Sequence, residues 1–144
     1  MEYRYLGVYY KFLDRVVREP RFLTNIRHPE AGWKVSRNEL RIFTGIENAR
    51  LVDFAVACRL RGFAVDWAGK SAIIIRRDPT RALLQLVERD SKGRRVLRVE
   101  IAREFERNTG LDAVDLLKRA GYGVSIDGGY LVVTGSGGGG TPSN

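Results

Sequence analysis

Hydrophobic positions in the first part of the chain follow a helical period. From residue 3 to residue 17, apolar side chains recur three and four residues apart, which predicts an amphipathic helix that the next proline ends. Residues 21–32 contain proline, glycine and mixed charges and are expected to be a connector. Ser36 and Glu39 then form the Ser-x-x-Glu pattern of a capping box, which predicts a second helix running to about Phe43.

The next segments change from a helical to a β-rich pattern. After a Thr-Gly break at residues 44–45, residues 47–61 are expected to form a third helix that ends at Gly62. Residues 63–67 and 71–77 are short and rich in β-branched and aromatic side chains, and they flank an Ala-Gly-Lys turn. This arrangement predicts a β-hairpin.

The segment after this hairpin fits two structures. An Asp-Pro pair at residues 78–79 resembles a helix N-cap followed by a first-turn proline, and residues 81–89 carry leucines on a helical stripe. A helix is favoured here. A hairpin of residues 82–89 with residues 94–101 stays open, because both runs are also compatible with strands.

The remaining segments repeat the earlier order. A helix is expected over residues 99–107, a Thr-Gly break at 109–110, a short helix over 112–120, and a hairpin of 122–126 with 130–134. A second set of three helices and a hairpin therefore follows the first.

The two sets also match in sequence. The Thr-Gly break recurs 65 residues later, Gly62 matches Gly121 at an offset of 59, and from there a gapless match continues to Ile74 and Val133. The second copy is thus expected to have lost six residues from its third helix. Such self-similarity predicts two related units, residues 1–78 and residues 79–134, followed by a disordered glycine-rich tail over residues 135–144.

Composition favours a folded protein with an anionic partner. Hydrophobic residues make up 44% and charged residues 29% of the 144 residues, which is ordinary for a protein with a core. The formal charge of +8 favours binding to polyanions such as nucleic acid. Twenty of the 25 basic residues are arginines, whose flat guanidinium matches phosphate and guanine edges, although a GC-rich genome would also raise their number. Gln85 is the only glutamine, which hints at a thermophilic or archaeal source. No apolar run is long enough to cross a membrane and the first residues lack a signal-peptide pattern, so a cytoplasmic location is expected.

The order of the predicted elements resembles the winged helix-turn-helix family over residues 4–134. The likeness depends on the capped second helix, the Thr-Gly-Ile turn at 44–46, the third helix at 47–61 and the wing at 63–75. It implies an α+β fold, mainly helical, of two winged-helix-like units (helix-helix-helix-β-hairpin) with short antiparallel hairpins. It also implies that the third helix enters a DNA major groove and that the wing contacts an adjacent backbone or minor groove.

Duplex DNA binding by a transcriptional regulator or genome-associated factor is therefore the expected function. Residues 1–78 hold 15 basic and 9 acidic side chains, a net charge of +6, against +2 for the remainder, so the first unit is the expected docking surface. The candidate contacts are polar or basic side chains of the predicted second and third helices, of the wing, and of a dense basic run in the second unit. They are Arg37, Asn38, Arg41, Asn48, Arg50, Arg61, Lys70, Arg76, Arg77, Lys92, Arg94 and Arg95.

Two other binding functions remain open. Apolar side chains cover most of the circumference of the predicted third helix, which indicates either burial between the units or a contact with a second copy or another protein. The protein would then be a non-catalytic assembly subunit. Aromatic residues near the amino terminus, beside Arg4 and Lys11, favour single-stranded DNA or RNA by stacking, although core packing is the favoured role of Tyr9 and Phe12 and of both tryptophans.

Catalysis and metal binding find little support. His28 is the only histidine and Cys58 the only cysteine, so no His-based or Cys-based metal cluster is expected and no cofactor is implied. A His-centred triad would depend on His28 alone, which is expected to be a surface side chain next to Pro29. Residues 57–65 resemble the helix-to-strand entry of the tRNA-splicing endonuclease catalytic domain. Cys58 stands where an aromatic residue is usual and no histidine follows, so this resemblance implies at most a non-catalytic partner subunit. The chain is not expected to be an enzyme.

Overall fold

A computed structural model describes residues 5–19 and 32–135 of the chain. The fold mixes helices with two small antiparallel sheets, so the predicted α+β class is confirmed. The predictions for Tyr3 and Arg4, for most of the connector including His28, and for residues 136–144 of the tail fall outside the described residues. None of the helices in the described ranges has the length and apolar character needed to cross a bilayer.

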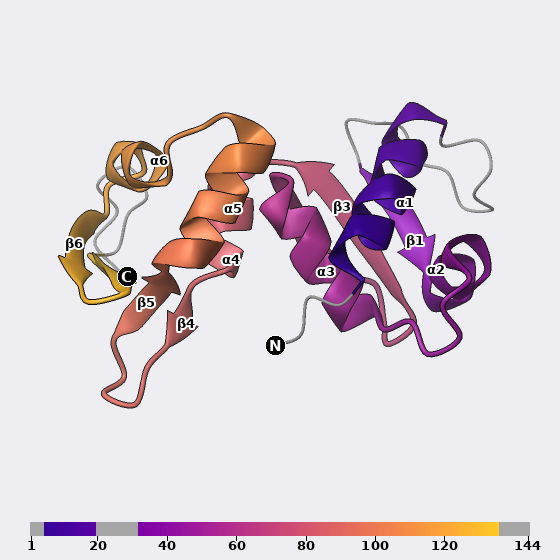
Figure 1. Cartoon of the computed structure of the whole chain (residues 1–144), viewed down its shortest axis with the longest axis horizontal. Helices are drawn as coiled ribbons and strands as arrows, with labels where there is room; N and C mark the ends of the chain where they lie inside the picture. The colour runs from indigo at the N-terminus through magenta and orange to yellow at the C-terminus, as the bar shows by residue number, and fades with distance from the viewer. Residues whose placement is uncertain (1–4, 20–31, 136–144) are drawn as a thin grey trace.

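The first half, up to residue 78, combines three helices with a three-stranded sheet (Figure 1). Its elements in chain order are α1 Leu6–Arg18, β1 Trp33–Ser36, α2 Arg37–Thr44, α3 Leu51–Leu60, β2 Phe63–Trp67 and β3 Ala72–Arg77. The strand order is β1-β3-β2, so the last strand lies in the middle of the sheet. Strand β1, which the sequence analysis missed, is an edge strand because it pairs only with β3.

The second half, from residue 79 onward, has the same kind of organisation with a four-stranded sheet. Its elements are α4 Pro79–Gln85, β4 Glu88–Arg89, β5 Arg95–Arg98, α5 Val99–Thr109, α6 Ala113–Arg119, β6 Gly123–Asp127 and β7 Tyr130–Thr134. The strand order is β4-β5-β7-β6. In both halves a strand that leads into a helix pairs with the last strand of the half, and the last strand pairs with its hairpin partner.

The segment with two possible structures contains parts of both. Residues 79–85 form helix α4, whose N-cap Asp78 accepts a hydrogen bond from the amide of Arg81. The helix ends at Gln85 rather than continuing to residue 89, and the short strand β4 then pairs with β5 across a turn at residues 90–94. The favoured helix is therefore correct for its first two turns, and the alternative hairpin is correct only near its turn.

Two details of the sequence match between the halves are wrong. Strand pairing places Trp67 opposite Ile73 but the matching Ile126 opposite Leu131, so the second hairpin turn is one residue shorter and the match has a gap there. The missing six residues also do not come from the third helix alone. Helix α3 has 10 residues and α6 has 7, while five residues join Gly45 to α3 and two join Gly110 to α6, so helix and loop each lose three.

The hydrophobic core has two clusters that meet along α3. Phe54 of α3 belongs to the first cluster, with α1 and the β1-β3-β2 sheet, whereas Val56 and Leu60 of the same helix belong to the second cluster, with α4, α5 and α6. Seven of the ten residues of α3 are buried. The helix therefore lies between the two halves, where Figure 1 shows α4 and α5 beside it.

Polar side chains also join the halves. The Gln85 side chain accepts a hydrogen bond from the Val65 amide at 2.8 Å and donates one to the Val65 carbonyl at 3.0 Å, so it pairs with the outer edge of β2 as another strand would. The Tyr10 hydroxyl donates to Glu104 Oε2 at 2.8 Å and accepts from the Asn108 side chain at 2.9 Å. These contacts connect β2 and α1 of the first half to α4 and α5 of the second.

Candidate nucleic-acid interface

Helix α2 presents three of the candidate residues to solvent. Its N-cap is Ser36, whose hydroxyl accepts a hydrogen bond from the Glu39 amide while the Glu39 carboxylate accepts one from the Ser36 amide, so the predicted capping box is confirmed. Glu39 and Leu40 face inward and are buried. Arg37, Asn38 and Arg41 are therefore on the outer side of the helix, where all three are exposed.

The connection from α2 to α3 contains two more of the candidate residues. Gly45 caps α2 in the left-handed conformation, with a φ of 73°, and its amide donates to the Arg41 carbonyl. The chain then turns through residues 46–50, and α3 begins only at Leu51. Asn48 and Arg50 are exposed in this connection instead of on the helix, which corrects the predicted start at residue 47.

The β2-β3 turn lies next to the amino end of α2. The Arg37 amide donates a hydrogen bond to the Ser71 carbonyl at 2.8 Å, which fixes the turn beside the helix. Lys70 is exposed in this turn, one residue before Ser71. Trp67 at the end of β2 is 48% exposed, so its predicted place in the core is wrong. The alternation along β2 predicts burial instead, because Trp67 is on the same face as Phe63 and Val65, which are in the core, but Trp67 is the last residue of the strand.

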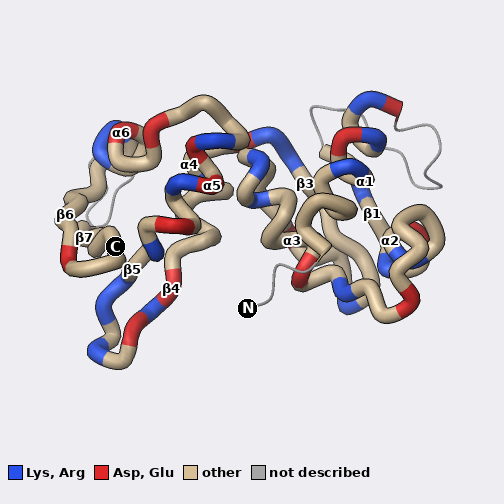
Figure 2. Tube along the Cα trace, viewed as in Figure 1, with Lys and Arg blue, Asp and Glu red and all other residues tan. Residues whose placement is uncertain are grey.

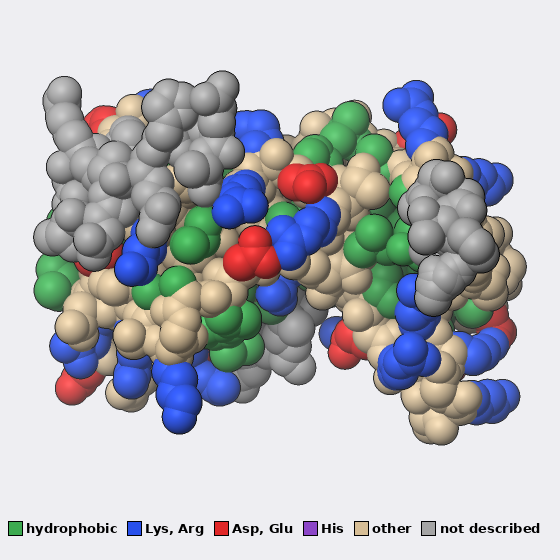
Figure 3. All heavy atoms as spheres, turned by 180° about the vertical axis from the view of Figure 1, so that it is seen from behind, with side chains coloured by type: hydrophobic (Ala, Val, Ile, Leu, Met, Phe, Trp, Pro, Cys, Tyr) green, Lys and Arg blue, Asp and Glu red, His purple; other side chains and the backbone are tan. Residues whose placement is uncertain are grey.

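We call this surface the basic edge and define it by six of the candidate residues. They are Arg37, Asn38, Arg41, Asn48, Arg50 and Lys70. Figure 3 shows Lys and Arg side chains gathered along the lower border of the first half, and Figure 2 shows where they lie along the chain. Glu47 is an exposed carboxylate in the same connection, so four cations and one anion give the edge a net charge of +3.

The cations of the basic edge differ from six other described arginines, which form ion pairs with carboxylates. Within residues 5–19 and 32–135, no carboxylate forms an ion pair with Arg37, Arg41, Arg50 or Lys70. By contrast, seven ion pairs between described residues engage arginines elsewhere, and these arginines are Arg61, Arg81, Arg94 (twice), Arg98, Arg107 and Arg119. An unpaired exposed cation keeps its full charge for an external anion.

Three candidate residues of the first half lie away from this edge. Arg76 and Arg77 are at the far end of β3 from the turn, and Arg61 follows α3. Arg61 donates to Asp14 at 3.2 Å and its guanidinium lies 4.3 Å from the centroid of the Tyr10 ring. These three do not extend the basic edge.

The basic run of the second half is largely held by internal contacts. Arg94 binds both Asp90 and Asp127 at 2.9 Å, and these contacts raise its pKa while Arg94 lowers the pKa of Asp90. Arg95 lies over the Tyr122 ring at 5.3 Å and donates to the Gly135 carbonyl. Lys92 is exposed in the β4-β5 turn. These three cations are close together in the sequence, but Arg94 and Arg95 make internal contacts with residues of the second sheet and its turns.

The helix in the recognition position does not present a reading face. Besides its buried residues, α3 has Asp53 and Arg59 partly covered, and Arg59 donates to Gln85 at 3.2 Å. Burial lowers the pKa of Arg59. Val52 is the only exposed residue of this helix. Of the two explanations for its apolar circumference, burial between the halves accounts for seven of its ten residues.

The aromatic residues of the amino terminus are used within the fold. Tyr9 and Phe12 are buried and contact the Phe54 ring, with centroids 5.8 Å and 5.3 Å away, as core packing predicts. Burial raises the pKa of both Tyr9 and Tyr10, and the bond to Glu104 raises that of Tyr10 further. Tyr5 is 40% exposed. A stacking surface for single strands is therefore not found among the described members of this group.

Metal and thiol chemistry have no site in the part of the chain that the structure describes. It contains no group of three or more His, Cys, Asp or Glu side chains that could hold a metal ion. Cys58 is fully buried in α3, and burial raises the pKa of its thiol.

Comparison with known proteins assigns no family to the chain. No protein-family model, curated protein or solved structure matches the chain. The function must therefore be inferred from the site itself.

Proposed function

We propose that the protein binds nucleic acid, with duplex DNA as the preferred form, through the phosphate contacts of the basic edge. The observation that carries the proposal is the grouping of four exposed cations without carboxylate partners where α2 meets the β2-β3 turn. Guanidinium and ammonium groups there would replace condensed counterions on a phosphate backbone. The protein is proposed to act by binding and not by catalysis.

The arrangement of the elements supports the preference for duplex DNA. Each half has a helix, a strand, two helices and a hairpin, with the last strand in the middle of the three common strands. This order resembles that of a winged helix, and we propose that each half is such a unit, with division near residue 78. In that comparison α2 and the β2-β3 wing correspond to elements that lie along DNA backbones.

The burial of α3 makes the proposed binding independent of sequence. Specific recognition requires side chains that reach base edges in a groove, whereas phosphate contacts carry no direct sequence information. Since α3 is packed between the halves, the first half offers phosphate contacts from α2, the connection and the turn. A genome-associated factor fits this geometry better than a regulator with one target site.

Salt dependence tests the proposal. Four phosphates neutralised by Arg37, Arg41, Arg50 and Lys70 give an expected slope of about −3.6 in log affinity against log salt. Fluorescence anisotropy with a labelled duplex of about 20 base pairs should therefore show roughly 100-fold weaker binding at about 200 mM salt than at about 50 mM. Two unrelated duplex sequences should bind with the same affinity within a few-fold.

A variant and its matched control locate the surface. Arg41→Gln combined with Lys70→Gln should reduce the slope by about two, because each neutralised phosphate contributes about 0.9. Arg103→Gln removes an exposed arginine of α5, remote in sequence from the basic edge, and should leave the slope unchanged. No binding at about 50 mM salt, equal effects of both variants, or preference for single-stranded DNA or RNA would each refute the proposed interface.

A second candidate function is assembly with another copy of the chain or with a different protein. It is favoured by the exposed apolar side chains of α2, since Ile42 is 68% and Phe43 40% exposed. Light scattering at about 50 µM protein tests the case of self-association. An oligomer that Ile42→Glu converts to a monomer would support it, and a monomeric wild-type chain would count against it.

A further inference from the structure

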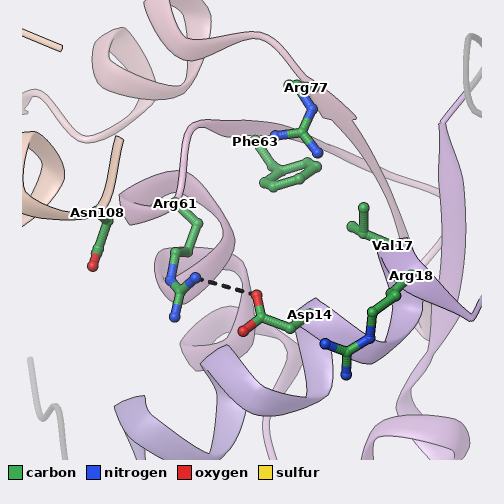
Figure 4. A pocket seen from close by; sticks show the side chains of 7 residues that line it. All are labelled: Asp14, Val17, Arg18, Arg61, Phe63, Arg77 and Asn108. Carbon is green, nitrogen blue, oxygen red and sulfur yellow. Dashed lines mark hydrogen bonds and ion pairs between the residues drawn. The ribbon is translucent and has the colours of Figure 1, made fainter. Parts of the chain in front are cut away.

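A pocket of about 290 Å³ lies at the end of the first sheet that is opposite to the basic edge (Figure 4). It is bordered by side chains from α1, from the end of α3, from β2, from β3 and from α5. The lining residues are Asp14, Val17, Arg18, Arg61, Phe63, Arg77 and Asn108. The six residues of β3 separate it from the β2-β3 turn by about 17–20 Å at the usual rise of a strand.

Two of its arginines are held by aromatic rings. The Arg77 guanidinium carbon lies 4.7 Å from the centroid of the Phe63 ring, and that of Arg61 lies 4.3 Å from the centroid of the Tyr10 ring. Stacking of this kind holds the flat guanidinium in place without using its N–H donors. The donors are thus positioned before any ligand arrives.

Arg61 has a donor that the protein leaves unused. Its Nη1 binds Asp14, but its Nε atom is buried and has no hydrogen-bond partner among the described residues. A buried donor without a partner is costly, and such groups are uncommon in native structures. An acceptor from a ligand would remove this cost if it reached Nε.

The residues that line the pocket carry an excess of positive charge. Arg18, Arg61 and Arg77 face a single carboxylate, Asp14, so the net charge is +2. Neither Arg18 nor Arg77 forms an ion pair with any described carboxylate. Asn108 contributes no further donor, because its amide group already donates to Tyr10, Leu60 and Glu104.

We propose that this pocket binds a terminal phosphate group. A phosphate monoester carries a charge of about −1.5 to −2 near pH 7 and three acceptor oxygens, which matches three arginines with a net charge of +2. A carboxylate has one charge and two oxygens and would leave one arginine without an acceptor. The phosphate belongs either to a free nucleotide or to the 5′ end of a nucleic-acid strand.

Calorimetry on the full chain at about 50 mM salt tests the chemistry. Adenosine 5′-monophosphate should bind, and adenosine should not. Arg18→Gln and Arg77→Gln should each weaken binding at least about fivefold, because each removes one charge-assisted contact to the phosphate. Asp14→Asn should tighten binding because it removes the only negative charge, and a misfolded variant could not produce that result.

Control variants separate this site from the basic edge. Arg41→Gln should weaken duplex binding and leave nucleotide binding unchanged, and Arg103→Gln should affect neither. Equal binding of adenosine, or an Arg103→Gln loss as large as that of Arg77→Gln, would overturn the proposal. A duplex with 5′-phosphates that binds more tightly than its 5′-hydroxyl form, with the gain lost in Arg77→Gln, would identify a strand end as the source. Nucleotide binding without that gain would identify a free nucleotide.

Discussion

Gln85 provides the sharpest test of how the two halves are joined. Strand β2 is at the edge of its sheet, and Val65 in it is only 3% exposed, so its outward amide and carbonyl are remote from water. The side-chain amide of Gln85 satisfies both groups and also accepts from Arg59 Nε at 3.2 Å. Replacement by methionine keeps the length and most of the volume of the side chain but removes all three hydrogen bonds.

The expected cost follows from the groups left without partners. Each buried polar group that loses its partner destabilises a protein by about 1–3 kcal/mol. With two backbone groups buried and Arg59 partly covered, Gln85→Met should lower the free energy of unfolding by about 2–4 kcal/mol. Urea denaturation followed by circular dichroism measures this difference, with the midpoint falling and the slope unchanged.

Asn38→Ala is the matched control. Asn38 is also a side-chain amide with a hydrogen bond, accepting from Arg41 at 3.4 Å, but it is exposed, so its loss should cost less than about 0.5 kcal/mol. If Gln85→Met costs no more than Asn38→Ala, water replaces the side chain at β2 and the argument from burial is wrong. A changed slope would instead show that the halves separate before they unfold.

Two further predictions concern titratable groups. Arg81 donates to Asp66 and lowers the pKa of that carboxyl, so the pair should stabilise the fold above about pH 4 and lose this effect as the pH falls through the lowered pKa. Thermal melts between about pH 2 and pH 6 should show a smaller pH dependence for Asp66→Asn than for the wild type, and equal curves would contradict the assignment. Cys58 is fully buried and burial raises its thiol pKa, so a thiol reagent at about pH 8 should modify it only as fast as the protein opens, whereas rapid reaction of the folded protein would show an open path to α3.

Local hydrogen bonding explains which elements the sequence predicts well. The capping box at Ser36 and the left-handed Gly45 and Gly110 depend on residues within one turn, and all three occur where their patterns are found. Helix α5 begins at Val99 as expected and extends two residues beyond the predicted end. The residues that form these hydrogen bonds are themselves the pattern in the sequence, so these elements can be predicted without knowledge of the rest of the fold.

Strands that pair with distant segments were missed for the opposite reason. β1 has four residues and no turn signal of its own, and its partner β3 comes about 40 residues later in the chain. β5 lies in residues 94–101, which the sequence left open as a strand, but its pairing with β7 across a similar separation was not identified. A short strand of this kind is defined by its partner, which sequence periodicity does not identify.

The candidate site shows the same division between local and distant causes. Exposure of Arg37, Asn38 and Arg41 follows from helical spacing in a capped helix. By contrast, the formation of an internal ion pair depends on carboxylates that are distant in the sequence. Asp14 pairs with Arg61 and Asp127 pairs with Arg94. The densest basic run in the sequence is therefore a poor guide to the surface with the most available charge.

The position of α3 links the stability of the protein to its proposed mode of binding. An exposed recognition helix needs a polar face, but Val56 and Leu60 are buried beside the second half, where they belong to the core cluster that includes α4 and α5. Restoring a polar reading face would place unpaired polar groups in that core, at about 1–3 kcal/mol for each group. The same helix cannot both join the halves and read a groove. If the chain binds DNA as proposed, its affinity must come from side chains outside α3, and the basic edge is the surface where such side chains lie together.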